Sequence, residues 1–490
     1  MKERSALVVG AGAGGLALAL LLARAGLRVT LTDCQPEIGG YLRRFTRDGL
    51  RFDTGYHFSG GFTGVMAQIL RVLGMDDTVT AEAIPNRIFL AESGIDLTLP
   101  ANCGHTGAEA VLCGRFPRDA AALHRLSGTI REIWRKTPMC DLRDLSPQEM
   151  TLSQYDAITV DEFCNALGMS REAATAANSF AMCHGTPLAE APMSFHARVG
   201  YALYHDLARP IGGGDPMIAA FRREAEKFGI SIRTGVKLVR FDAPDAHGEC
   251  RLARFDDGTA LETDMVFFTI HPLAVRDLLP ETALTPAMFR RLSRLRETTS
   301  FFCSYFRTDD AAPVEPGLVS YFSHNDLDAI LNGGGAPYST GYMIERESGA
   351  TVIAAFRTMP PGTPPDAPGS RRERRNDARY REFKERTETE IAADLTRIMP
   401  ELKGHLHPVT SGSPLTCLDY DPPTGSAYGA RCICGQSRMF GPLPVRNFFV
   451  AGQSALVPGV MGTMLTSFSV FRQAMGEEVY ARLIRASGLI

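Results

Sequence analysis

The chain has 490 residues, a length that predicts two or three domains rather than a single core. Hydrophobic residues make up 44% and charged residues 22%, which is typical of globular proteins and excludes a disordered or fibrous chain. The 52 basic and 55 acidic residues nearly cancel to a formal charge of -3, so no overall basic field favours nucleic acid.

Cysteine usage and hydropathy predict a reduced protein without a membrane-spanning helix. The 11 cysteines are scattered without a Cys-x-x-Cys pair, so we expect neither a disulfide framework nor a metal site. The N-terminal run MKERSALVVG continues into GAGAGG rather than into a cleavage site, which argues against a signal peptide. No stretch reaches the roughly 18 uncharged apolar residues that a spanning helix needs. We therefore expect a cytoplasmic protein.

The first glycine-rich motif follows a short apolar segment. Residues 5–9 are predicted to form a strand, residues 16–25 a helix, and residues 27–32 a second strand that ends at Asp33. This order of strand, glycine loop, helix, strand and acid is typical of dinucleotide-binding folds. A merely structural tight turn is the alternative, but it would need neither the flanking elements nor the acid.

Each part of this motif has a physical role. Gly10 makes a tight turn, Gly12 lets the backbone approach a pyrophosphate, and Gly15 lets helix and sheet pack closely. The helix N-terminus presents free N–H groups and a partial positive charge to phosphates. Asp33 lies about 20 residues further on, where its carboxylate can accept both ribose hydroxyls and would repel a 2′-phosphate.

Two further glycine-rich loops indicate which dinucleotide binds. Residues 34–41 read CQPEIGGY, and residues 52–62 read FDTGYHFSGGF. NAD does not require loops in these places, whereas a flavin dinucleotide extends past its pyrophosphate and needs backbone that can approach a flat ring. We therefore favour FAD, with ordinary turns as the alternative for each loop taken alone.

The middle of the chain contains further predicted elements. They are an amphipathic helix at residues 217–228, a pair of strands within 230–241, strands at 252–255 and 261–270, and a helix over the charge run 371–390. Acidic residues interleave with basic ones in the charge run, so we expect a solvated helix face; a membrane or partner role is the less favoured alternative.

The C-terminal segment supplies a second strand–glycine–helix unit. Residues 447–450 predict a buried strand, the loop PGVMG follows, and a helix is expected from residue 463 to about residue 485. Such a unit provides a second set of helix N-terminal amides, which in flavin folds hold the ribityl chain and the pyrimidine edge of the ring.

Together these motifs resemble the FAD-dependent phytoene desaturase superfamily, and more narrowly its retinol saturase and carotenoid isomerase branch. The match includes the glycine loops above and, further along, residues 184–192, 211–216, 413–416, 425–429 and 451–462. The resemblance implies an α/β fold in which a discontinuous Rossmann-like FAD-binding domain carries an inserted mixed α+β substrate domain, as in amine oxidases and phytoene desaturases. It assigns residues 1–66, 206–280 and 441–490 to the FAD-binding domain, and residues 67–205 and 281–440 to the substrate-binding domain.

Two positions depart from the superfamily pattern. The acid that closes the second strand is usually Glu, whereas Asp33 is shorter by one methylene. Desaturases usually have an acid after the C-terminal Ala-Gly pair, whereas Gln453 is uncharged and matches the saturase-like branch. Reduction or isomerisation is therefore favoured over phytoene desaturation itself.

The resemblance also implies which residues contact FAD. It places the backbone of Val236 at the adenine edge, although a strand valine taken by itself is ordinarily a core residue. The residues predicted to bind the cofactor are Gly10, Gly12, Ala13, Gly14, Gly15, Asp33, Cys34, Gly39, Gly40, Tyr41, Val236, Gly452, Gln453, Gly459, Val460 and Met461.

No motif for side-chain catalysis occurs in the sequence. This fits flavin chemistry, in which the protein supplies position and electrostatics. By resemblance, Tyr56 and His57 lie beside the flavin ring and Tyr428 faces them, which makes these three the candidate catalytic residues. His57 could titrate near neutral pH and Tyr56 could donate a proton; the alternative is that they only pack against the ring. His184 and His196 are expected to be structural.

The favoured function is an FAD-dependent oxidoreductase that saturates, desaturates or isomerises carbon–carbon bonds of an apolar polyene or isoprenoid-like substrate. One full dinucleotide fingerprint is present, so we expect electrons to pass through a transient donor or acceptor. Peripheral membrane contact and the oligomeric state stay open. A flavin amine oxidase is one alternative, but the single tryptophan, Trp134, does not suggest an aromatic amine cage. The other is a non-catalytic escort of prenylated proteins, whose relatives have eroded glycine motifs, unlike this chain.

Overall fold

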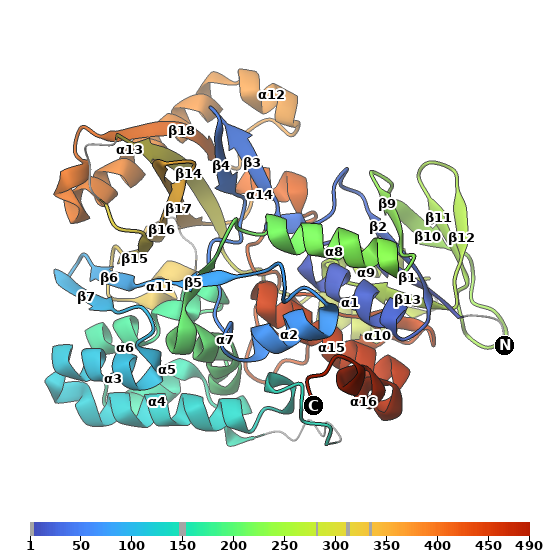
Figure 1. Ribbon diagram of the computed structural model, residues 1–490. Coiled ribbons are helices and arrows are strands. Elements are labelled where there is room, and N and C mark those ends of the chain that lie inside the picture. The colour runs from blue at the N-terminus through green and yellow to red at the C-terminus, as the bar shows by residue number, and fades with distance from the viewer. Residues whose placement is uncertain (1–3, 147–152, 281–282, 310–313, 333–335) are drawn as a thin grey trace.

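Two large sheets organise the chain (Figure 1). The structure is a computed structural model that describes residues 4–146, 153–280, 283–309, 314–332 and 336–490. The first sheet contains the N-terminal motif, and the second lies in the part of the chain that was predicted to bind substrate. The predicted α/β fold class is confirmed.

The first sheet has six strands in the order β19-β20-β13-β1-β2-β9. These strands are β1 (Ser5–Val9), β2 (Arg28–Asp33), β9 (Ser231–Thr234), β13 (Met265–Phe268), β19 (Gly441–Pro442) and β20 (Phe448–Val450). Neighbours pair in parallel except β19, which is antiparallel to β20. All six strands come from the three segments that we assigned to the FAD-binding domain. The domain boundaries themselves stay a prediction.

Both faces of this sheet are buried, as expected for parallel strands. Ala6 and Val8 of β1 pack into one core, whereas Leu7 and Val9 pack into another on the opposite face. The first core contains α1 (Ala13–Arg24), α2 (Val65–Leu73), α8 (Asp215–Lys227), α15 (Gly459–Met475) and α16 (Glu477–Ala486). The second contains β10 (Leu238–Phe241), β11 (Leu252–Phe255), α9 (Pro272–Leu278) and α10 (Pro286–Leu292), with β12 (Ala260–Glu262) paired to β11.

The second sheet has seven strands in the order β18-β14-β17-β16-β15-β6-β7. They are β6 (Asn86–Leu90), β7 (Ile95–Leu99), β14 (Ser300–Thr308), β15 (Gly317–Phe322), β16 (Ser339–Glu347), β17 (Ala350–Met359) and β18 (Leu406–Gly412). Neighbours are antiparallel except β15 and β6, which are parallel. Two short pairs, β3 (Arg44–Arg47) with β4 (Leu50–Asp53) and β5 (Ala81–Ala83) with β8 (Ala208–Pro210), lie outside the large sheets.

The two faces of the seven-stranded sheet have different partners. One face packs against α13 (Ala378–Ile398), and the other belongs to a core with α3 (Gly104–Arg115), α4 (Ala120–Arg135), α5 (Val160–Ala166), α6 (Arg171–Ala177), α7 (Met193–Asp206) and α11 (Leu327–Leu331). Because side chains alternate along a strand, Phe302 and Phe306 of β14 lie beneath α13, whereas Phe301 and Cys303 point to the other side. The sheet thus separates a structural face from a cavity face.

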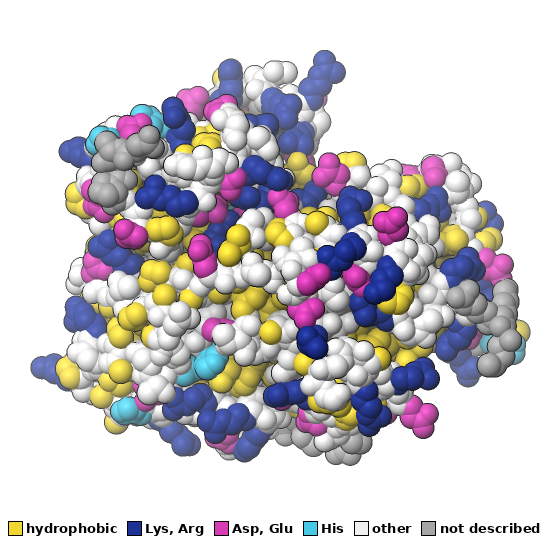
Figure 2. Space-filling view, viewed as in Figure 1, with side chains coloured by type: hydrophobic (Ala, Val, Ile, Leu, Met, Phe, Trp, Pro, Cys, Tyr) yellow, Lys and Arg dark blue, Asp and Glu magenta, His cyan; other side chains and the backbone are white. Residues whose placement is uncertain are grey.

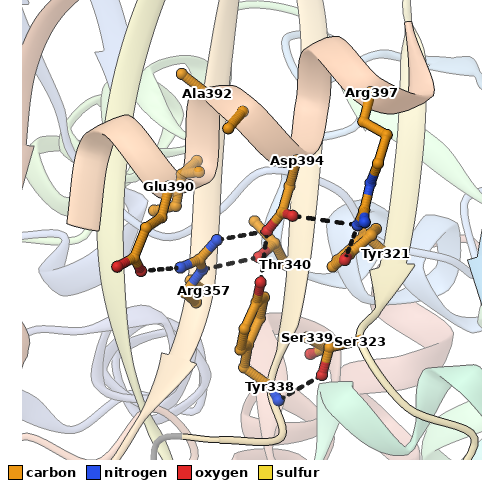
Figure 3. Close-up of polar contacts among 12 residues, drawn as sticks. Tyr321, Ser323, Tyr338, Ser339, Thr340, Arg357, Glu390, Ala392, Asp394 and Arg397 are labelled. Carbon is orange, nitrogen blue, oxygen red and sulfur yellow. Dashed lines mark hydrogen bonds and ion pairs between the residues drawn. The ribbon is translucent and has the colours of Figure 1, made fainter. Parts of the chain in front are cut away.

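A buried arginine fixes α13 on the sheet (Figure 3). Arg357 of β17 donates from Nη2 to Asp394 Oδ2 (2.6 Å) and from Nη1 to Glu390 Oε2 (3.0 Å), both on α13. The guanidinium also lies 4.0 Å from the centroid of the Tyr338 ring, and Tyr338 Oη donates to Asp394 Oδ2 (2.8 Å). A charged group in an otherwise apolar layer therefore sets where the helix sits.

Three expectations from the sequence are corrected. The C-terminal helix is not continuous, because Gly476 (φ +85°) ends α15 and α16 starts anew after it. The charge run 371–390 is divided into α12 (Arg371–Asn376) and α13, because Asp377 caps α13 by accepting from the Tyr380 N–H (2.7 Å). The strands within 230–241 do not pair with each other: β9 joins the six-stranded sheet and β10 joins β11.

The outer surface shows no single charged region on the side drawn in Figure 2, where basic and acidic side chains are interspersed over most of the area. Among the residues that the structure describes, no helix combines the length and the apolar character needed to cross a membrane.

Candidate active site

A cavity of about 1120 Å³ lies where the two sheets meet. On one side it is lined by the loops that follow β1 and β2 and by the N-terminal end of α15. On the other side Phe301 and Cys303 of β14 and Phe356 of β17 line it. The loops at the carboxyl ends of parallel strands are where α/β folds bind ligands, so this cavity is the candidate active site.

The glycine loop after β1 has the geometry that a pyrophosphate requires. Gly10 has φ +101°, and a Cβ on Gly15 would lie 1.8 Å from Gly10 O, so both positions need glycine for the fold itself. A Cβ on Gly12 would meet nothing within 4 Å, and Gly12 lines the cavity. The loop thus leaves open space beside the N-terminus of α1, where backbone N–H groups favour an anion.

Asp33 lies at the edge of the same space. Its Oδ2 accepts from the Ala11 N–H (2.7 Å) and its Oδ1 accepts from the Gln35 N–H (2.8 Å). Each carboxylate oxygen keeps a second lone pair, so both can still accept from ribose hydroxyls. The two amide bonds hold the carboxylate against the glycine loop, in the position that the fingerprint predicts.

The second glycine loop packs on the first. Gly39 and Gly40 have φ +111° and +53°, and the Gly39 N–H donates to Ala11 O (2.7 Å). A Cβ on Gly40 would lie 3.1 Å from the Cα of Gly12. The close approach of the two loops explains why glycine occupies this position, and it places Cys34 and Tyr41 on the cavity wall as well.

Residues near the C-terminus of the chain line the same cavity. The lining residues in this segment are Gln453, Gly459, Val460 and Met461. Val236, which is predicted to contact the adenine, also lines the cavity. The N-cap position of α15, like that of α1, has no side-chain hydrogen bond, so two helix N-termini present free amides to one cavity.

Gly452 is the one predicted cofactor residue that is not among the lining residues. Its φ is +91°, and a Cβ there would lie 2.9 Å from Thr269 O, so the glycine is needed for packing against the end of β13. Its contact with FAD stays a prediction.

The three candidate catalytic side chains all line the cavity. His57 is stacked on Phe356, with ring centroids 4.7 Å apart, and its Nδ1 lies 3.8 Å from Asp53 Oδ2. Burial lowers the pKa of His57 to about 4, although Asp53 acts in the opposite direction. The imidazole is therefore neutral at pH 7, and the expectation that it titrates near neutral pH is wrong.

Burial raises the pKa of the Tyr56 and Tyr428 hydroxyls, so both keep their protons at neutral pH. Tyr56 Oη is buried without a hydrogen-bond partner among the described residues. His184 and His196, which we expected to be structural, are buried and lie in mutual contact, with His184 Nε2 3.0 Å from His196 Nδ1.

A cluster of buried charges beside His57 was missed by the sequence analysis. Arg44 Nε lies 2.9 Å from Asp53 Oδ1, and Arg209 Nη1 lies 2.6 Å from Asp53 Oδ2. Arg209 Nε also donates to Glu345 Oε2 (2.6 Å), although the two residues are 136 positions apart. All four side chains are less than a tenth exposed. Because the partners come from β4, β3, β8 and β16, no local signal in the sequence could have revealed the cluster.

Glu345 makes the stability of the protein depend on pH. Burial raises its pKa to about 7, with a smaller contribution from Asp53, against the opposing effect of Arg209. The folded protein therefore holds a proton that the unfolded chain releases above its ordinary pKa near 4.5. The resulting stabilisation is complete below about pH 4.5 and is lost as the pH rises through 7. We expect the unfolding free energy, measured with urea, to decrease as the pH rises from 5 to 8.

Glu345→Gln should flatten this dependence, because glutamine does not titrate. The matched control is Glu347→Gln, which removes a neighbouring carboxylate that accepts from Arg44 Nη2 (2.8 Å). The control should keep the slope of the unmodified protein. Equal slopes in the unmodified protein and in Glu345→Gln would contradict the assignment.

The far wall of the cavity is mostly apolar. Phe58, Cys183, Val199, Leu203, Phe301, Cys303, Phe356 and Tyr428 line it. Phe356 fits there because Gly341, its partner across β16 and β17, has no side chain: a Cβ would lie 2.1 Å from the Phe356 ring. The cavity therefore has a largely apolar wall; that a substrate occupies it stays a prediction.

Comparisons with known proteins agree with this geometry. All-trans-retinol 13,14-reductase of Danio rerio is 22% identical over 533 residues, which cover 94% of this chain and 84% of that protein. Phytoene desaturase of Fusarium fujikuroi is 24% identical over 347 residues, covering 65% of this chain and 57% of that protein. The crystal structure of an oxidoreductase from Methanosarcina mazei has the same fold, with a TM-score of 0.62 at 16% identity over 96% of this chain and 100% of that chain.

These similarities confirm the relationship that the sequence motifs predicted. The family model described as flavin containing amine oxidoreductase matches residues 13–467, which is most of the chain. The open space beside Gly12, the carboxylate of Asp33 and the two helix N-termini fit the family's cofactor, FAD. The chain therefore belongs to the flavin-containing amine oxidoreductase family.

Proposed function

We propose that the protein is an FAD-dependent oxidoreductase acting on a carbon–carbon bond of an apolar, polyene or isoprenoid-like substrate. The observation that supports this most is the apolar wall, which lines the same cavity as the glycine loops, Tyr56 and His57. The names of the similar proteins, a retinol reductase and a phytoene desaturase, point to substrates of this class. Gln453, in place of an acid, favours reduction or isomerisation.

The residues of the cavity have distinct tasks in such a reaction. Bound FAD supplies the hydride chemistry at its ring. Gly12 and its neighbours would hold the pyrophosphate through backbone amides, and Asp33 would hold the ribose. The apolar wall excludes water and contributes about 25 cal/mol for each Å² of apolar substrate surface that it buries. Tyr56 and Tyr428 hold protons on hydroxyls beside the substrate space and are the candidate proton donors.

The test is anaerobic absorbance spectroscopy of the purified yellow protein mixed with candidate polyenes, before and after chemical reduction. We expect the flavin bands to change with at least one polyene, and Tyr428→Phe to slow that change without loss of bound FAD. If no apolar substrate alters the flavin spectrum, the proposal is wrong. Release of hydrogen peroxide on addition of amines would favour the amine oxidase alternative instead.

A further inference from the structure

Helix α7 contributes one charged residue to the apolar part of the cavity. Three of its residues, Arg198, Val199 and Leu203, line the wall. Leu203 lies at the end near the flavin loop, because a Cβ on Gly60 would be 2.7 Å from its backbone nitrogen. Arg198 lies five residues earlier, which is about 7.5 Å along the helix at 1.5 Å per residue. Along α7, Arg198 is therefore the lining residue that lies farther from residues 55–61 than Leu203.

Arg198 has guanidinium N–H groups without a hydrogen-bond partner among the described residues. Its Nε–H donates to Thr137 Oγ1 (3.2 Å), and this is its one hydrogen bond among the described residues. Its Nη1 lies 3.7 Å from Asp156 Oδ1, beyond hydrogen-bond distance. Asp156 is already engaged by Ser194 Oγ (2.5 Å) and by the Ser153 N–H (2.7 Å). The side chain is 24% exposed, so the remaining N–H groups of its planar fork can reach a ligand.

A second cation lies near Arg198. Arg438 is a second guanidinium nearby: burial raises the pKa of Cys432, and both Arg438 and Arg198 act against that rise. Arg438 donates to the backbone oxygens of Leu456 (2.7 Å) and Gln453 (3.4 Å), which carry no net charge. Within the described ranges, Asp156 is the one carboxylate within 4.0 Å of either guanidinium. Arg438 is not among the residues that line the cavity, so of these two guanidinium groups Arg198 alone borders it.

We propose that Arg198 binds the carboxylate head group of an otherwise apolar substrate whose chain runs along Val199 and Leu203 toward FAD. This inference rests on the proposed function and names its substrate class: an apolar polyene or isoprenoid acid. A planar carboxylate matches the two parallel N–H groups of a guanidinium. A carboxylate places one negative charge beside the single guanidinium of α7 that borders the cavity, whereas a phosphate would bring about 1.5 to 2 negative charges.

Binding the head group at one end has a consequence for the reaction. A substrate anchored at Arg198 presents to the flavin ring the bond that lies at a fixed distance from its carboxylate. The guanidinium then determines which of several equivalent bonds in a polyene reacts, and it does so without touching the reacting atoms.

The test is a binding comparison on the purified FAD-loaded protein, by equilibrium dialysis with all-trans-retinoic acid and its methyl ester. The two probes share one chain and differ in the charge of the head group. We expect the acid to bind at least 10-fold more tightly than the ester. In Arg198→Met the two affinities should become equal through loss of acid binding alone, and Arg198→Lys should keep part of the preference. Arg135→Met, on the exposed end of α4, is the control and should behave as the unmodified protein.

The outcomes separate this inference from the proposed function. Equal binding of acid and ester to the unmodified protein would overturn the head-group assignment and leave the apolar cavity intact. Equal loss of both probes in Arg198→Met would also overturn it, because a merely structural role acts on both. If neither these probes nor a hydrocarbon polyene such as phytoene binds, the proposed function fails as well.

Discussion

Replacing Gly12 by valine is expected to give a folded protein that no longer retains FAD. Gly12 has φ -76° and ψ -176°, extended backbone that any residue adopts, and a Cβ there meets nothing within 4 Å. The added Cβ therefore enters open space, and the side chain occupies the space that the pyrophosphate needs. We expect at least about 100-fold weaker FAD binding, equivalent to about 2.8 kcal/mol. The ratio of flavin to protein absorbance and a flavin titration of the apoprotein measure this.

Gly15→Ala is the matched contrast, since it changes the same loop. Its Cβ would lie 1.8 Å from Gly10 O, inside the fold rather than in the cavity. This variant should lose folding stability together with FAD, whereas the circular dichroism and urea midpoint of apo Gly12→Val should match those of the unmodified apoprotein. Retention of stoichiometric FAD by Gly12→Val would contradict the assignment of this space to the cofactor.

The cofactor half of the cavity could be predicted because its determinants are local. Gly10, Gly12, Gly15 and Asp33 lie within one strand–helix–strand unit, where backbone sterics and helix-terminal amides decide the geometry. Of the 16 predicted cofactor residues, 15 line the cavity, all but Gly452; Val236 and residues 453–461 were implied by the family resemblance rather than by this local unit. Contact of each with FAD stays a prediction, and the presence of Val236 and residues 453–461 at the same cavity depends on the long-range pairing of the six-stranded sheet.

The substrate half could not be predicted in the same way. The pKa of His57 depends on burial, on Asp53 four residues away, and on Arg209, which lies 152 residues away in sequence yet donates to the His57 carbonyl oxygen. Arg198 looks in the sequence like any arginine in an amphipathic helix, and only the fold shows that it borders an apolar cavity. Helix breaks at Gly476 and Asp377 were missed because apolar or charged periodicity continues across them. Long-range packing decides the first two features, whereas the helix breaks follow from local backbone features, the positive φ of Gly476 and the N-cap carboxylate of Asp377.

Replacing Arg357 by methionine is expected to destabilise the fold by about 3 kcal/mol, measured as the unfolding free energy in urea. The Arg357 side chain is 3% exposed, and its loss leaves the Asp394 carboxylate, 12% exposed, without its closest cation at 2.6 Å (Figure 3). Removing one partner of a buried pair typically costs about 3–5 kcal/mol, because the other charge stays desolvated. The lower value applies because Asp394 still accepts from Tyr338 Oη.

Arg397→Met tests whether the burial of Arg357, rather than the number of positive charges near Asp394, accounts for the expected loss of stability. Arg397 pairs with the same carboxylate, with its Nη2 3.2 Å from Asp394 Oδ1, but its side chain is 55% exposed. An exposed ion pair contributes about 0 to 1 kcal/mol, so this variant should stay within about 1 kcal/mol of the unmodified protein. Similar losses in both variants would show that α13 depends on the net charge around Asp394. A loss confined to Arg357→Met would show that one desolvated guanidinium holds the helix on the sheet whose opposite face lines the cavity.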